Sequence, residues 1–192
     1  VEIKYVVSGP EGCGTLDNYQ ESQLKVTTGE VKGSTPTAAP GYKFVGWFMD
    51  ENCDIHVENV ITGAVDSTTN KMTPQKRPSD NLHFAATYYA KFEYDVADLT
   101  ITKQGYNEID GKQSFIFTVT GPEGFSKKIV IQGNGTVVLK GLKIGEYTVT
   151  EDTAWSWRYT PDGGVATQKI TLQPGQTNSV TYVNNRTNNK WL

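Results

Sequence analysis

Three polar side chains end the apolar faces of strand-like segments in this sequence. In "LTITK", Lys103 shares a face with Leu99 and Ile101, because side chains alternate along a strand. The same alternation puts Glu151 on the apolar face of "YTVTE" and Asn184 on the apolar face of "VTYVN". Together the three residues supply an amine, a carboxyl group and a carboxamide.

Buried side by side, these three groups could react with one another. An unpaired buried ammonium costs several kcal/mol, so burial of Lys103 requires a partner or neutralisation. Burial favours the neutral forms of an amine and of a carboxyl group. A neutral amine is a nucleophile, and a neutral Glu151 could polarise the Asn184 carbonyl and transfer protons. Attack of Lys103 on Asn184 would expel ammonia and leave an amide cross-link, a step that proximity accelerates.

Each residue also has a simpler interpretation. A strand end is where an apolar face runs out into solvent, and a lysine can extend its ammonium to water along an apolar surface. Lys103 could form a salt bridge with Glu151 without any covalent bond. Asn185 follows Asn184 directly, so a shift of register would exchange the two amides. The shared parity of the three polar residues favours the cross-link, with Asn184 as the amide.

The elements that would position these residues are short strands in the second half of the chain. Turn pairs such as Asp110-Gly111, Asn134-Gly135 and Pro174-Gly175 separate apolar runs. Short strands at this spacing predict a β-sandwich. The predicted strands are "LTITK", "SFIFTVTG", "KKIVIQG", "GTVVLKGL", "GEYTVTE", "WSWRYT", "TQKITLQPG" and "SVTYVNN".

The first half predicts a separate β domain. In "YKFVGWF", strict alternation puts Phe44 and Phe48 on one face and Trp47 on the other, and "FAATYYAKFEY" predicts a long closing strand. The polar residues 50–81 predict loops with a short helix or strand. The pattern resets at "DVAD", so we expect domains at 1–96 and 97–192. The chain opens directly on the strand-like "VEIKYVV", and we expect it to be part of a longer protein.

The order of "LTITK", "GEYTVTE" and "VTYVNN" resembles the Cna protein B-type (SpaA-like, prealbumin-like) domains of Gram-positive surface proteins and pilins. The resemblance covers about residues 98–188. It implies an Ig-like sandwich in which Lys103 and Asn184 form an intramolecular isopeptide bond, assisted by the acid Glu151.

The first half, about residues 1–94, resembles bacterial surface repeats of the internalin B-repeat type through "GYKFVGW" and "ATYYAKF". That resemblance implies a β-grasp-like or mixed β domain, so the expected fold class is mainly β with two tandem domains. Both resemblances imply an extracellular, cell-wall-attached adhesin or pilin-like protein of a Gram-positive cell. The implied role is that of a structural stalk or spacer, a monomer whose partners are neighbouring modules of the same polypeptide.

Composition and motifs weigh against several other classes of function. Lys and Arg number 8 against 13 Asp and Glu in residues 1–96, and 10 against 8 in residues 97–192. Neither half has the basic excess that nucleic acid requires, and no segment is long and apolar enough to insert in a membrane. His56 and His83 are isolated, and we find no nucleophile, phosphate-binding or dinucleotide motif. We therefore expect no enzyme, no cofactor and no metal site.

The two cysteines, Cys13 and Cys53, lie in the first half. In an extracellular protein they could form a disulfide, and otherwise they are two free thiols. Sequence spacing does not decide between these states.

An aromatic segment offers a different class of function. Read as a strand, "WSWRY" puts Trp155, Trp157 and Tyr159 on one face. Sandwich interiors commonly bury such residues, and a place in the core is our expectation. On an exposed face the same aromatics could stack on a carbohydrate or contact a host matrix protein.

Overall fold

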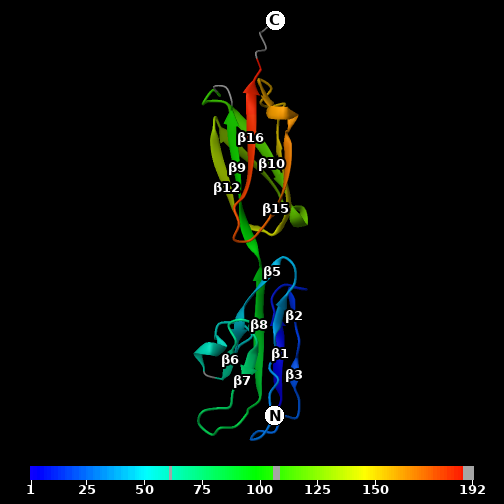
Figure 1. The fold of residues 1–192 in the computed structure, drawn as a ribbon, viewed down its shortest axis with the longest axis vertical. Helices are drawn as coiled ribbons and strands as arrows, with labels where there is room; N and C mark the ends of the chain where they lie inside the picture. The colour runs from blue at the N-terminus through cyan, green and yellow to red at the C-terminus, as the bar shows by residue number, and fades with distance from the viewer. Residues whose placement is uncertain (61, 106–108, 188–192) are drawn as a thin grey trace. The chain divides into compact units, whose positions relative to one another are not determined.

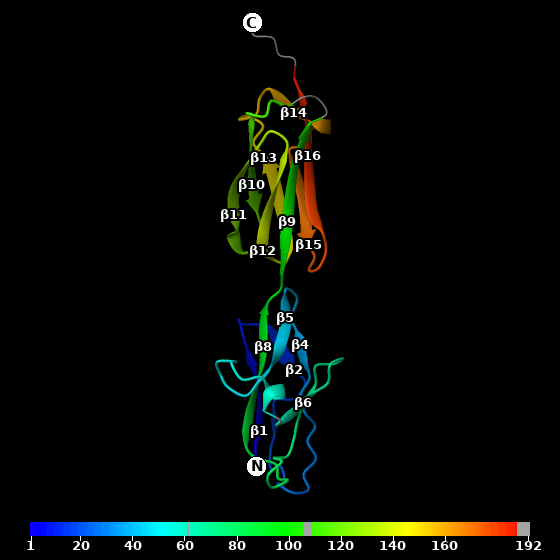
Figure 2. The ribbon, with the colours of Figure 1, turned by 90° about the vertical axis from the view of Figure 1, so that its left-hand side faces the viewer.

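The computed structural model describes residues 1–60, 62–105 and 109–187, and this part of the chain is mainly β, as predicted (Figures 1 and 2). Within these ranges, no helix has the length and apolar character needed to cross a bilayer. The chain divides into two compact units, Val1–Tyr94 and Asp95–Leu192. This division lies two residues before the predicted boundary.

The N-terminal unit is built around a mixed four-stranded sheet in the order β3-β1-β8-β5. Its central strands β1 and β8 run parallel, and the outer strands pair with them antiparallel. Two-stranded ribbons β2-β4 and β6-β7 complete the unit. Its elements are β1 (Ile3–Ser8), β2 (Gly14–Leu16), β3 (Gln20–Glu21), β4 (Pro36–Ala38), β5 (Tyr42–Phe48), the 3₁₀ helix η1 (Val57–Asn59), β6 (Gly63–Val65), β7 (Met72–Pro74) and β8 (Ala86–Tyr94).

A β-bulge in β5 overturns the strict alternation predicted for "YKFVGWF". Phe44 pairs with Phe92, but the next paired residue is Gly46, so one extra residue is inserted at Val45. The insertion moves Trp47 to the core face, where its side chain is 2% exposed and its ring contacts the rings of Phe44 and Tyr5. The predicted segregation of Trp47 from Phe44 is therefore wrong.

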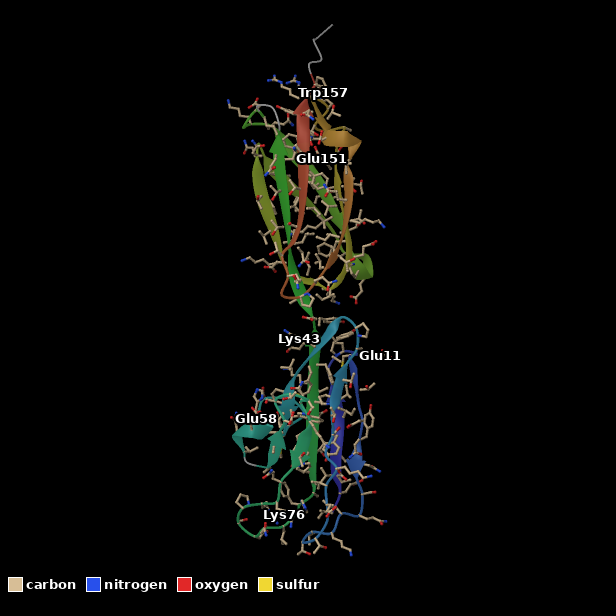
Figure 3. The ribbon with its side chains drawn as sticks, viewed as in Figure 1. Glu11, Lys43, Glu58, Lys76, Glu151 and Trp157 are labelled. Atoms are coloured by element: carbon tan, nitrogen blue, oxygen red, sulfur yellow. The ribbon has the colours of Figure 1, made fainter. Side chains whose placement is uncertain are left out.

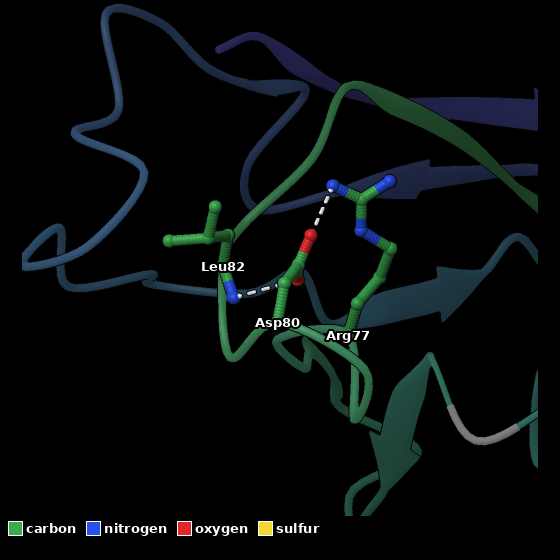
Figure 4. Close-up of polar contacts among 3 residues, drawn as sticks. All are labelled: Arg77, Asp80 and Leu82. Atoms are coloured by element: carbon green, nitrogen blue, oxygen red, sulfur yellow. Dashed lines mark hydrogen bonds and ion pairs between the residues drawn. The ribbon is translucent and has the colours of Figure 1, made fainter.

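The polar region 50–81 contains η1 and the β6-β7 ribbon, in line with the predicted short elements among loops. A turn at its end is closed locally by Asp80 (Figure 4). Its carboxylate forms an ion pair with Arg77 at 2.7 Å and accepts a hydrogen bond from the Leu82 N–H at 3.1 Å. Such a turn delivers the chain into β8.

The C-terminal unit is a sandwich of two four-stranded sheets, in the orders β12-β9-β16-β14 and β11-β10-β13-β15 (Figure 2). The strand β9 is the first strand of the unit and β16 the last, and they pair in parallel at the centre of one sheet. The elements are β9 (Val96–Gly105), β10 (Ser114–Thr120), η2 (Pro122–Gly124), β11 (Ser126–Gln132), β12 (Gly135–Lys143), β13 (Gly145–Glu151), β14 (Tyr159–Pro161), η3 (Asp162–Gly164), β15 (Thr167–Leu172) and β16 (Asn178–Arg186).

The core of this sandwich comes from the inward faces of both sheets. Alternate residues of β9, β10, β13 and β16 are buried, and they include Leu99, Phe117, Val149 and Tyr182. A side-chain hydrogen bond also fixes the start of β16, because the Asn178 side-chain amide donates to the main-chain carbonyl of Asp98 on β9. The parity assigned from the sequence to the segments in β9, β13 and β16 is confirmed.

The predicted strand "WSWRYT" is wrong for most of its length. Residues 153–158 form turns, and only Tyr159 and Thr160 of the predicted strand belong to an observed strand, β14. The Asp152 side chain accepts a hydrogen bond from the Trp155 N–H at 3.2 Å, and the Ser156 N–H donates to the Asp152 carbonyl at 3.3 Å. These local bonds give the backbone an alternative to a sheet ladder.

Candidate functional site

Lys103 and Asn184 lie on the two central strands of one sheet. In the parallel pair β9-β16, Lys103 is opposite Tyr182 and Asn184 is opposite Gly105, two residues further along the same face. Both side chains point into the sandwich and are 0% exposed. Diagonal neighbours two residues apart on adjacent strands are within reach of a long side chain.

Glu151 reaches the same place from the facing sheet. It is the last residue of β13 and is 2% exposed. The Asn184 Nδ2 donates a hydrogen bond to Glu151 Oε1 at 2.6 Å. The predicted carboxyl and carboxamide are therefore in direct contact across the core.

The Lys103 ammonium lies in apolar surroundings. Its Nζ donates to the Gln104 carbonyl at 2.8 Å and lies 4.3 Å from the centre of the Phe115 ring. Burial lowers the pKa of Lys103 to about 8, and the nearby charge of Glu151 offsets part of that effect. A substantial fraction of this amine is neutral near pH 8, which is the form that can act as a nucleophile.

Two buried oxygen atoms at this site have no hydrogen-bond partner in the described part of the chain. They are Glu151 Oε2 and Asn184 Oδ1. A carboxylate and an amide carbonyl are both acceptors, so they cannot pair with each other. The site therefore lacks a donor for Oε2 and for Oδ1 among the described residues.

The three aromatic residues of "WSWRY" are separated by the turn that replaces the predicted strand. Tyr159 is buried against Phe115, as expected for a core residue. Trp155 and Trp157 are 56% and 52% exposed, so their predicted place in the core is wrong. With Gln113, Ala154 and Arg158 they line a surface groove of about 430 Å³.

Cys13 and Cys53 are both buried free thiols in this structure. The Cys53 thiol donates to the Ser8 hydroxyl at 3.4 Å. Cys13 Sγ lies 3.0 Å from the position that a Cβ would occupy on Gly9. The two sulfur atoms therefore flank the same dipeptide, and the Cys13–Cys53 disulfide stays a prediction.

The two histidines, His56 and His83, have different surroundings and do not form a common site. The exposed His56 ring lies 4.2 Å from the Phe48 ring, centre to centre, whereas the buried His83 contacts the Gly29 carbonyl through Nε2. Across residues 1–60, 62–105 and 109–187, no group of three or more His, Cys, Asp and Glu side chains is arranged to hold a metal ion.

Two buried polar residues with several hydrogen bonds, Ser156 and Glu21, were not identified from the sequence. Ser156, 1% exposed, donates from its hydroxyl to Glu151 Oε1 at 3.2 Å. In the N-terminal unit, Glu21 Oε1 accepts hydrogen bonds from the Tyr5 hydroxyl, the Asn18 amide and two main-chain N–H groups. The only available signal for Ser156 was its place between two tryptophans in a segment that also carries Asp152.

No family model matches the chain, and no curated protein matches it in sequence. Among solved structures it is similar to the TIE protein of Bacillus anthracis, with a TM-score of 0.49 and 16% identity over 96% of this chain and 33% of that one. It is also similar to a minor pilin of Streptococcus agalactiae, with a TM-score of 0.42 and 11% identity over 100% of this chain and 98% of that one.

A third similar structure is an adhesin from Mobiluncus mulieris that contains intramolecular disulfide, isopeptide and ester bond cross-links. Its TM-score is 0.41 and its identity 13%, over 80% of this chain and 57% of that one. The chain spans about a third of the length of the pilus-presented adhesin structures that it matches, at 34%.

Proposed function

We propose that this chain is a pair of structural modules from a Gram-positive cell-surface stalk, adhesin or pilin-like protein. In this proposal the C-terminal module is stabilised by an isopeptide bond between Lys103 and Asn184. The observation that carries it is the joint burial of an amine, a carboxyl group and a carboxamide, with Glu151 and Asn184 hydrogen-bonded at 2.6 Å. Such a buried set is costly unless its members pair or react.

The proposed reaction conserves atoms and charge. The neutral Lys103 Nζ attacks Asn184 Cγ, and a bond between these two atoms forms. The bond between Cγ and Nδ2 breaks, and Nδ2 leaves as ammonia after taking up one proton. Lys103 gives up one proton in the same process, and Glu151 carries it to the leaving nitrogen. The protein reacts once with itself and turns over no substrate.

The position of the bond suits a load-bearing module. It would join the first strand of the C-terminal unit directly to the last one. Force applied to the ends of the unit would then act on a covalent link, and not only on main-chain hydrogen bonds worth about 0.5–1.5 kcal/mol net each. The N-terminal unit would act as a spacer, and the whole would lie outside the cell, attached to the wall.

Intact-protein mass spectrometry tests this proposal. We expect the wild-type chain to be lighter than its sequence mass by one ammonia, and proteolysis to yield a branched peptide that contains Lys103 and Asn184. Lys103→Arg keeps a positive charge but cannot form this amide, and Glu151→Gln removes the proton carrier. Both variants should have their full sequence mass, as should Asn184→Ala. A full mass for the wild type would overturn the cross-link.

The disulfide between Cys13 and Cys53 is a second proposed cross-link, confined to the N-terminal unit. Its support is that both thiols lie beside Ser8 and Gly9. The test is the intact mass with and without reductant: a disulfide accounts for a difference of two hydrogen atoms, which Cys13→Ser abolishes. Equal masses in both conditions would leave two free thiols.

The exposure of Trp155 and Trp157 favours a second candidate function, in which the groove binds a carbohydrate or a host matrix protein. Exposed indole rings stack on the apolar faces of sugar rings, and Gln113 and Arg158 line the same groove with polar groups. Binding on a broad glycan array should be lost in Trp155→Ala and Trp157→Ala, and kept in Val130→Ala, which alters an exposed residue on β11. Lack of binding by the wild type across the array would remove the carbohydrate ligand.

A further inference from the structure

The hydroxyl group of Ser156 is the second donor to the acid of the candidate cross-link. Ser156 is buried, whereas its neighbours Trp155 and Trp157 are exposed, so the turn directs one small side chain inward. Figure 3 shows Glu151 and Trp157 toward the same end of the C-terminal unit. Ser156 Oγ lies 3.2 Å from Glu151 Oε1 and 3.4 Å from the Asp152 carbonyl oxygen.

The main chain fixes Ser156 from both sides. Its N–H donates to the Asp152 carbonyl at 3.3 Å, and its carbonyl accepts from the Tyr159 N–H at 2.8 Å. Tyr159 in turn is buried against Phe115. Main-chain hydrogen bonds therefore connect Ser156 to the buried residue Tyr159 and to Asp152, the residue after Glu151.

This arrangement makes the two oxygen atoms of Glu151 unequal. Oε1 accepts from Ser156 and from Asn184, whereas Oε2 has no partner among the described residues. Both donors occupy Oε1, so Oε2 is the oxygen that is free to accept a proton during the reaction.

We propose that Ser156 is a positioning residue for the cross-linking reaction: it holds Glu151 Oε1, so that Oε2 stays free to carry the proton that passes from Lys103 to the leaving nitrogen. The inference rests on the proposed cross-link. The other donor to Oε1 is the nitrogen that departs as ammonia, so during the reaction Ser156 is the donor that stays. Without it, Glu151 loses its fixed orientation at the moment when the proton must be delivered.

The test is a time course of cross-linking in newly made protein. The full chain is synthesised in a cell-free translation system, synthesis is stopped, and the fraction that has lost ammonia is followed by intact mass. We expect Ser156→Ala to form the bond about tenfold more slowly than the wild type, the effect of losing one hydrogen bond that acts in the transition state. Ser156→Thr restores a hydroxyl group and should recover most of the rate.

A loop control separates positioning from a loss of local structure. Thr153 is an exposed residue of the same turn and does not line the groove. Thr153→Ala leaves the contact between Ser156 and Glu151 in place, and its rate should stay near that of the wild type. Equal slowing by Thr153→Ala and Ser156→Ala, or failure of Ser156→Thr to recover the rate, would overturn the positioning role. So would a wild-type rate in Ser156→Ala. A wild type that never loses ammonia is a different result, because it removes the cross-link itself and this inference with it.

Discussion

Replacing Lys103 with methionine should destabilise the C-terminal unit and leave the N-terminal unit unchanged. Methionine keeps a long, unbranched side chain in the buried site but removes the amine. The bond from residue 103 to residue 184 closes a loop of about 80 residues, for which the chain-entropy treatment of a cross-link gives about 4.5 kcal/mol. Lys103 Nζ is an uncharged amide nitrogen in the cross-linked wild type, so the substitution removes no buried cation, and loss of the cross-link dominates the change.

We therefore expect Lys103→Met to lower the free energy of unfolding of the C-terminal unit by about 4 kcal/mol. For a unit of this size that corresponds to a fall in Tm of about 15–30 °C. Differential scanning calorimetry of the full chain measures it, and the transition of the N-terminal unit is an internal control. Lys140→Met, which alters an exposed lysine on β12, is the matched variant and should leave both transitions in place. A fall of less than about 5 °C, in a protein whose wild type is cross-linked, would show that the bond does not stabilise the C-terminal unit as proposed.

Two further predictions concern titration and the N-terminal unit. In Asn184→Ala, Lys103 stays a free amine whose folded pKa, about 8, is below its ordinary value of 10.5. Between these two pH values the unfolded state binds more protons than the folded state, so the free energy of unfolding of the C-terminal unit should rise as the pH increases from 8 to 10.5. Urea titrations should show a rise of about 3 kcal/mol in the variant relative to the wild type. A difference between variant and wild type that does not change with pH would contradict a buried free amine. Glu21→Ala leaves several donors without their acceptor, and should destabilise the N-terminal unit by about 2–4 kcal/mol, whereas the exposed Glu93→Ala should change it little. Equal effects of the two substitutions would contradict the role assigned to Glu21.

The parity of the reactive set was predictable because it depends on local alternation. Lys103, Glu151 and Asn184 each follow apolar residues at a spacing of two, and a strand must put them on the buried face. Their contact was not predictable in the same way. It depends on the parallel pairing of β9 with β16, which joins segments about 80 residues apart, and on the facing sheet, which brings Glu151 to Asn184.

Alternation failed where the backbone leaves the regular strand. At Val45 one inserted residue exchanges the two faces of β5, so that Trp47 and not Gly46 is deeply buried. At "WSWRY" the pattern fits a strand, but Asp152 bonds the following N–H groups and starts a turn. The residue directed inward is then Ser156, which a hydrophobicity pattern does not select.

The mass of the intact wild-type chain decides whether the isopeptide bond forms. We expect a protein lighter than its sequence by one ammonia, with a proteolytic fragment in which Lys103 is joined to Asn184. Under reducing conditions the disulfide does not contribute, so the missing mass reports the isopeptide bond alone. A folded chain of full sequence mass, with unlinked Lys103 and Asn184 peptides, would show that the proposed bond does not exist.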